Sequence, residues 1–140
     1  MLACGFCPMN RLSGTITGIQ HHDLFLIVTL AVGSHHFKAL ILEEHYKIGE
    51  TVWLIFKESE VLVATKESRV SARNAFLSPI TTITTGTLLC EISFAFSGEV
   101  ISAILTREAI ESLGLHEGYE AMWFVKANEV TIQKRSAHES

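Results

Sequence analysis

Four consecutive residues near the middle of the chain, Ser71-Ala72-Arg73-Asn74, combine a hydroxyl, a guanidinium and an amide with closely spaced backbone N–H groups. Such a set of hydrogen-bond donors with one fixed positive charge suits a small anion. The arginine presents a planar fork of donors, the asparagine tolerates unusual backbone angles, and the alanine lets another group approach the main chain closely. Taken alone, the stretch is more typical of a polar turn between two domains, so its meaning depends on the rest of the chain.

The composition is that of a folded protein without a polyanionic partner. Hydrophobic residues make up 48% of the 140 residues and charged residues 19%, which argues against disorder outside the two ends. The 11 Lys and Arg are outnumbered by 15 Asp and Glu, for a net charge of -4. A nucleic-acid binder usually shows a basic surplus, so we expect no nucleic-acid partner. A small anion held by local donors is compatible with an acidic whole.

The N-terminal residues 1–10 have no basic region followed by an apolar run of signal-peptide length, and no run of 18 apolar residues occurs anywhere. We therefore expect a cytoplasmic protein with no membrane partner, in which the three cysteines are reduced thiols. Cys4 and Cys7 form a Cys-x-x-Cys pair, but a structural zinc site needs two further ligands at matching spacing. We predict no metal site, although the sequence leaves open a metal role for this pair and for the adjacent histidines.

Alternating β-branched and apolar runs separated by turn residues predict five short strands in the first half of the chain. Gly33-Ser34 is a plausible two-residue turn, so the second and third strands are expected to form a hairpin. The five predicted strands are Thr15–Ile19, Leu24–Val32, His35–Leu42, Thr51–Lys57 and Glu60–Lys66.

The second half repeats the plan of the first. At an offset of 64 positions, Asn10, Ile16, Leu24 and Ala39 meet Asn74, Ile80, Leu88 and Ala103. Later the offset becomes 69, and Gly49, Lys57 and Val61 meet Gly118, Lys126 and Val130. Two related β units in tandem are therefore predicted, at residues 8–67 and 69–134.

The difference between the offsets, 69 minus 64, means that the second unit contains five extra residues, and they fall within Thr106–Leu115. Thr106 can cap a helix and Gly114 can end it, so a short helix is predicted over Thr106–Leu113. Five strands with one short helix describe a closed OB-like barrel, in which closure hides the sheet edges. The predicted fold is all-β, with two tandem OB-like five-stranded small barrels and a short helix in the second.

Several motifs, in order, resemble those of the molybdate-binding Mop or TOBE domains, and the tandem arrangement looks like a two-unit molbindin. The resemblance covers the chain from about Asn10 to Gln133. The motifs are Ser71-Ala72-Arg73-Asn74, Thr106-Arg107-Glu108-Ala109, Leu113-Gly114-Leu115 and Lys126-Ala127-Asn128.

The chain departs from the family pattern at several positions. Ser78 and Ala109 stand where the family has Gly and Ser, and Asn128 replaces a hydroxyl residue. In the first unit, residues 7–10 replace the first Ser-Ala-Arg-Asn, and Glu58 places a carboxylate beside the expected anion site. These departures leave open whether the first unit binds a ligand.

The resemblance implies a cytoplasmic protein that binds molybdate or tungstate for storage or homeostasis, without an organic cofactor. It also implies a homo-oligomer, with a trimer favoured and ligands held where subunits meet. On the residues alone, Lys126 is more typical of a solvated cation at a strand end. The oxyanion-binding residues implied are Ser71, Ala72, Arg73, Asn74, Thr106, Lys126, Ala127 and Asn128.

No nucleophile elbow, phosphate loop or dinucleotide-binding glycine motif is present, so enzymatic activity has no support among the residues. The alternative to an oxyanion-binding protein is a non-enzymatic TOBE-type module, which has weak or lost oxyanion binding and regulates or assembles with a partner.

Overall fold

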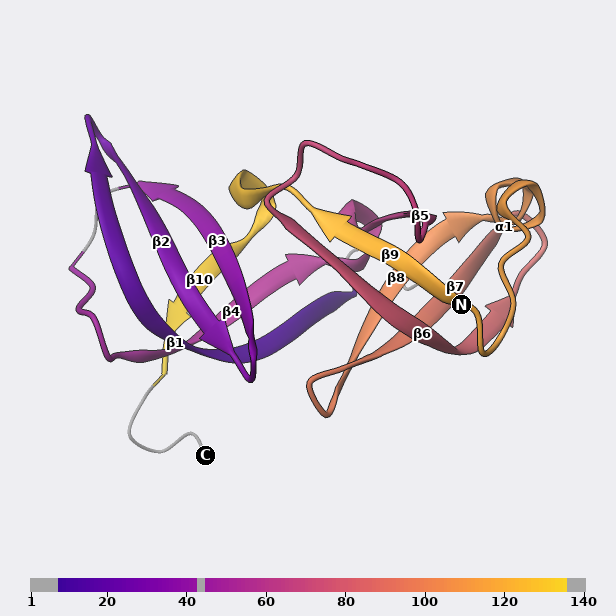
Figure 1. Ribbon diagram of the computed structural model, residues 1–140, viewed down its shortest axis with the longest axis horizontal. Helices are drawn as coiled ribbons and strands as arrows, with labels where there is room; N and C mark the ends of the chain where they lie inside the picture. The colour runs from indigo at the N-terminus through magenta and orange to yellow at the C-terminus, as the bar shows by residue number, and fades with distance from the viewer. Residues whose placement is uncertain (1–7, 43–44, 136–140) are drawn as a thin grey trace.

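The computed structural model describes residues 8–42 and 45–135. Within these residues the chain forms ten strands, one α-helix and two short 3-10 turns. The strands make two curled five-stranded sheets that lie side by side along the long axis of the molecule (Figure 1). All of the strand pairs are antiparallel. The predicted all-β architecture of two OB-like units is confirmed.

The two sheets have the same strand arrangement. The first has the order β10-β4-β1-β2-β3 and the second the order β5-β9-β6-β7-β8. The strands of the first half are β1 (Met9–His22), β2 (Phe25–Val32), β3 (His35–Leu42), β4 (Thr51–Lys57) and β5 (Leu62–Thr65). Those of the second half are β6 (Asn74–Thr85), β7 (Leu89–Phe96), β8 (Glu99–Thr106), β9 (Glu120–Val125) and β10 (Thr131–Lys134).

The two halves exchange their last strands. β5 follows β4 in the chain but pairs with β9 of the second sheet, from Leu62 opposite Phe124 to Thr65 opposite Ala121. β10, in yellow among the violet strands of Figure 1, pairs in turn with β4 of the first sheet. The division at residues 8–67 and 69–134 therefore follows the sequence repeat, whereas each sheet combines four strands of one unit with the fifth strand of the other.

The first strand is longer than the sequence indicated. β1 spans 14 residues, and it pairs with β4 along its first half and with β2 along its second half. Alternate residues are buried from Asn10 to Ile16, so the polar residues between them face outward instead of forming a loop. A register shift between Ile16 and Gly18 bends the strand, as bulges do in small barrels.

The predicted hairpin and helix are both confirmed. Gly33 adopts a left-handed φ of 60° in the turn between β2 and β3, a conformation that costs glycine little. Helix α1 spans Arg107–Leu113, and the Thr106 hydroxyl accepts a hydrogen bond of 3.1 Å from the Ala109 N–H at its start. Gly114, with φ of 66°, ends the helix.

An aromatic cluster joins the two sheets into one core. Phe37 and Phe56 come from the first sheet and Trp123 from the second, and all three are almost fully buried. The Phe37 and Phe56 ring centroids lie 6.1 and 6.0 Å from that of Trp123. The buried indole N–H donates to the Ser78 hydroxyl at 3.0 Å, which gives a structural role to the serine that replaces the family's glycine. The core is therefore shared and not divided at the unit boundary.

Candidate functional site

Asn74, the first residue of β6, attaches the second unit to the open edge of the first sheet. Its side-chain oxygen accepts from the Lys38 backbone N–H at 2.6 Å, and its amide nitrogen donates to the Lys38 carbonyl at 2.9 Å. β3 is an edge strand, so this amide takes the place of a neighbouring strand. Asn74 is fully buried. Its side chain therefore fixes the start of β6. Of the groups of Asn74, only the backbone would then be available for the predicted anion binding.

The same contact occurs at the pseudo-equivalent position. The Asn10 side chain donates to the Ser102 carbonyl and accepts from the Ser102 backbone N–H, both at 2.8 Å. Asn10 lies 64 positions before Asn74, and Ser102 lies 64 positions after Lys38. Both distances equal the repeat offset. Each unit thus holds the edge strand of the other, β3 or β8, through one asparagine.

The structure brings together the two segments that the sequence analysis assigned to the anion site. Asn74 lies opposite Val125 in the β6–β9 register, so Arg73 and Lys126 extend side by side from the ends of the two strands. The 3-10 turn η2 (Ala127–Glu129) follows and packs against β3. We call the segments Ser71–Asn74 and Lys126–Asn128, with Lys38 of β3, the second cradle.

The second cradle concentrates positive charge. Lys38, Arg73 and Lys126 contribute a cation from each of three segments, and Arg73 and Lys126 are exposed. Among the residues described, neither Arg73 nor Lys126 forms an ion pair, and the Lys38 ammonium donates to the Thr29 hydroxyl at 2.7 Å. Cations without a neighbouring carboxylate attract an anion, and guanidinium and ammonium groups both donate to oxyanion oxygens.

The other residues of the second cradle suit close contact with a small ligand. Ser71 and Asn128 are exposed polar residues, and Ala72 and Ala127 are half-buried. Small side chains leave the neighbouring backbone accessible. Lys38 was missed by sequence reasoning because it lies outside the motifs, and only the contact between Asn74 and β3 identifies it.

Thr106 has its contacts elsewhere. It ends β8, whose edge receives Asn10 and not Asn74, and its hydroxyl caps α1. Within one chain the structure therefore does not place Thr106 with the segments of the second cradle. A contribution to the anion site would require a neighbouring subunit.

The pseudo-equivalent segments of the first unit, Pro8–Asn10 and Lys57–Ser59 with Ser102, form what we call the first cradle. Met9 lies opposite Lys57 in the β1–β4 register, and the Glu58 N–H donates to the Pro8 carbonyl at 3.1 Å. The 3-10 turn η1 (Glu58–Glu60) packs against β8, as η2 packs against β3. The first cradle thus has the same architecture with different side chains.

Glu58 is the unusual group of the first cradle. Only 8% of the residue is exposed, and its Oε1 has no hydrogen-bond partner among the described residues. Desolvation by burial, with a hydrogen bond and charge repulsion from Glu91, raises the pKa of Glu58 to about 7. Glu91 was missed by sequence reasoning, although a signal was available: its counterpart 64 positions earlier is the apolar Ile27.

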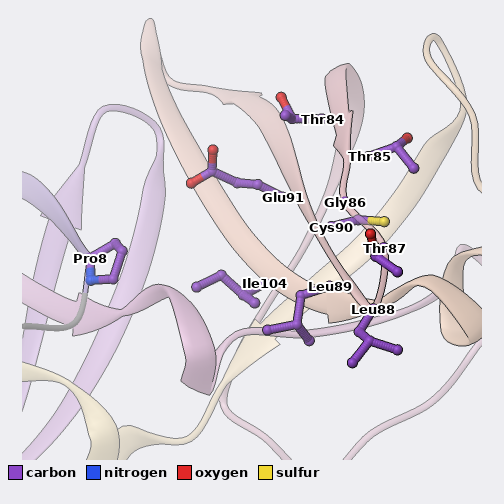
Figure 2. Close-up of a pocket in the computed structure, with 10 residues that line it drawn as sticks. All are labelled: Pro8, Thr84, Thr85, Gly86, Thr87, Leu88, Leu89, Cys90, Glu91 and Ile104. Carbon is purple, nitrogen blue, oxygen red and sulfur yellow. The ribbon is translucent and has the colours of Figure 1, made fainter. Parts of the chain in front are cut away.

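A cavity of about 510 Å³ lies on the second sheet (Figure 2). Pro8 and Glu91 lie toward one side of it, and Thr85 and Thr87 toward the other. Its remaining lining residues are Thr84, Gly86, Leu88, Leu89, Cys90 and Ile104. The cavity is mainly apolar, and no Lys or Arg among the described residues lines it, so it does not match the chemistry of an oxyanion site.

No group of three or more His, Cys, Asp or Glu side chains that could hold a metal ion occurs in residues 8–42 and 45–135. Cys4 and Cys7 lie outside the described residues. Cys90 is buried in β7, as expected for a core residue. His35 stacks on Phe96 with ring centroids 4.5 Å apart. No helix in the described part of the chain is long and apolar enough to cross a membrane.

Both sheets have the OB-like strand arrangement, and a 3-10 turn of each unit packs on the edge strand of the other. The TOBE domain model matches residues 70–132, and that segment belongs to the TOBE domain family. The resemblance proposed from the motifs is confirmed.

Two known proteins are similar over most of the chain. The molybdenum transport protein ModE of Azotobacter vinelandii is 24% identical over 131 residues, which cover 88% of this chain and 48% of ModE. The chain thus spans about half the length of this curated relative. A molybdate-bound crystal structure of the cytoplasmic molybdate-binding protein ModG matches with a TM-score of 0.85 and 27% identity, over 90% of this chain and 96% of that one.

Proposed function

We propose that this protein binds molybdate, or the chemically similar tungstate, at the second cradle. The observation that carries the proposal is that Arg73 and Lys126 lie side by side, next to the Lys38 backbone at the edge of β3, where neither cation forms an ion pair with a described carboxylate. The similarity to molybdate-bound ModG supports the choice of ligand.

A tetrahedral dianion needs several convergent donors and few acceptors around it. Backbone N–H groups near Ala72 and Arg73 would bind two of its oxygens, and Ser71 and Asn128 would donate from their side chains. The ammonium of Lys126 and the guanidinium of Arg73 would balance the two negative charges. The bound anion would thus exchange its hydration shell for fixed donors, and its negative charge would offset the cations of the cradle.

The role that fits these features is reversible binding in the cytoplasm, for storage or homeostasis of the oxyanion. Binding needs only the side chains of the cradle and their backbone, so we propose neither an organic cofactor nor a catalytic reaction. The relatives are described as binding or transport proteins, and this supports the same reading.

We also propose that the protein is a homo-oligomer, with a trimer favoured. Large apolar side chains remain exposed on both units, including Leu24 at 71%, Leu88 at 77% and Val100 at 63%. Clustered exposed apolar surface is typical of interaction sites. Assembly would also allow a neighbouring subunit to bring Thr106 to the second cradle.

Isothermal titration calorimetry with molybdate, tungstate and sulfate tests the proposed function on the full chain. We expect saturable binding of molybdate and tungstate, and weaker binding of the smaller sulfate. If millimolar molybdate and tungstate both produce no heat and no mass shift in native mass spectrometry, oxyanion binding is excluded. The interaction module would then be the remaining function.

A further inference from the structure

The two cradles have the same backbone, so their side chains can be compared position by position. Lys57 precedes η1 with φ and ψ of -70° and 141°, and Lys126 precedes η2 with -70° and 148°. Glu58 and Ala127 are therefore equivalent, because each is the first residue of its turn. Each turn also packs on an edge strand of the partner unit, the same strand that the asparagine of the turn's own unit contacts.

The equivalent positions differ in charge. Going from the second cradle to the first, a cation is lost at two positions and a carboxyl is gained at two others. The replacements are Met9 for Arg73, Ser102 for Lys38, Glu58 for Ala127 and Glu91 for Ile27. The second cradle therefore presents Arg73 and Lys126 and includes Lys38, whose ammonium bonds Thr29, whereas the first retains only Lys57 beside two carboxyl groups.

The Glu58 carboxyl is turned into the structure and not toward solvent. Its residue is more than nine-tenths buried, one oxygen has no hydrogen-bond partner in residues 8–42 and 45–135, and Glu91 of β7 contacts the side chain. An unmatched buried oxygen costs free energy, so packing alone does not account for it. The two carboxyl groups would oppose the approach of an oxyanion, because both supply acceptor oxygens and each repels a second anion when it is ionised.

We propose that Glu58, held by Glu91, closes the first cradle to oxyanions and so limits each chain to the second cradle. This inference rests on the proposed function. The charged groups involved are Glu91 on β7 and, on the segment of Glu58 itself, the exposed Lys57 and Glu60. β8, packed against the turn, contributes the neutral Ser102 at the point of contact with Asn10.

The first test replaces both carboxyls by their counterparts, in Glu58→Ala/Glu91→Ile. Equilibrium dialysis followed by molybdenum analysis gives the number of anions bound per chain at saturation. We expect this number to double, because the variant cradle keeps Lys57, Ser59 and the backbone donors. Glu60→Ala is the matched control, because it removes an exposed carboxylate from the same turn, and its number should equal that of the unmodified protein.

The second test introduces a carboxyl into the second cradle and does not depend on the folding of the first variant. Ala127→Glu should weaken molybdate binding at least tenfold, whereas Ala127→Gln, with similar bulk and no charge, should weaken it less. Equal effects of the two substitutions would overturn the proposed role of charge. An unchanged number of anions in Glu58→Ala/Glu91→Ile, with normal binding by the unmodified protein, would overturn the closure of the first cradle. Absence of binding by the unmodified protein would instead contradict the proposed function itself.

Discussion

Single residues at equivalent positions have different tasks in the two units. Asn10 and Asn74 both hold an edge strand, and their role is structural. The side chains of Arg73 and Lys126 are exposed at the second cradle and form no ion pair or hydrogen bond with another described residue. Glu58 is buried at the first cradle and carries an unmatched oxygen. Each of these assignments predicts a different effect of mutation.

Replacing a cation of the second cradle should weaken anion binding without unfolding the protein. Loss of one donor leaves an oxyanion oxygen unmatched in a desolvated site, which costs about 1 to 3 kcal/mol. Arg73→Ala and Lys126→Ala should therefore each raise the molybdate Kd tenfold or more in calorimetry, with an unchanged circular dichroism spectrum. Lys57→Ala, at the equivalent position in the first unit, is the control and should leave the Kd unchanged.

Replacing Asn74 should instead destabilise the fold. Asn74→Ala leaves the Lys38 N–H and carbonyl without their partners, so we expect the free energy of unfolding to fall by about 3 kcal/mol. Urea denaturation monitored by tryptophan fluorescence measures this loss. Asn128→Ala, at an exposed position, should change the stability by less than about 0.5 kcal/mol. Equal stability of the two variants would contradict the structural role of Asn74.

Glu58 should make stability depend on pH. Its folded pKa of about 7 lies above its ordinary value of 4.5, so the folded state binds the proton more tightly than the unfolded chain does. Its contribution is thus complete below pH 4.5 and is lost as the pH rises toward 7, by up to about 3 kcal/mol. Glu58→Gln should raise the Tm at pH 8 and change it little at pH 4. A uniform shift across this range, measured by differential scanning calorimetry, would rule out the titration.

At the scale of the elements, local sequence patterns predicted those strands, turns and helices that form through interactions between neighbouring residues. The β2–β3 hairpin, strand β4 and helix α1 were all predictable, because a turn glycine, a run of alternating residues and a capping threonine act on their own neighbours. The length of β1 was not predictable in this way. Its polar residues between Asn10 and Ile16 resemble a loop until β4 provides a pairing partner.

The candidate site was predictable only in part. The motifs identified both segments of the second cradle, and the β6–β9 register places them side by side. Lys38 lies far from the motifs in sequence, and only its contact with Asn74 reveals it. The repeat sets Glu91 apart from its apolar counterpart Ile27, but only its contact with Glu58 gives it a role. Long-range contacts of this kind leave no periodic signal in a single sequence.

Substitution of Thr106 distinguishes its capping of helix α1 from the predicted role in anion binding. Thr106→Ala removes the N-cap and should lower the free energy of unfolding by about 1 kcal/mol. If the cap is its only task, the molybdate Kd stays unchanged in the same protein. A tenfold weaker Kd would show that Thr106 reaches the anion, which the contacts within one chain do not provide. Thr106→Ser, which retains the hydroxyl, should restore both properties.

At the scale of the whole molecule, the shared core and the exchanged strands predict a single cooperative unfolding transition. Neither sheet is complete without a strand from the other unit, and Trp123 packs on Phe37 and Phe56 across the boundary. Calorimetric and van't Hoff enthalpies should therefore agree, at a protein concentration where the assembly state does not change. Two resolved transitions would show that the units fold separately.

The exposed apolar residues predict assembly. Sedimentation equilibrium should give a mass above that of one chain, with three chains favoured. Leu88→Gln removes one of the most exposed apolar side chains and should shift the equilibrium toward smaller species if it lies in the interface. A concentration-independent monomer would exclude assembly and any site shared between subunits.

The exchange of β5 and β10 means that the two units are interlocked and not merely adjacent. The connector between Thr65 and Asn74 joins them covalently, yet the sheets on either side would stay paired without it. Each unit supplies the other with a strand and with an asparagine on its edge. A protease cut within residues 66–73 would therefore leave two fragments that remain bound to each other in native buffer and separate only when the chain is unfolded.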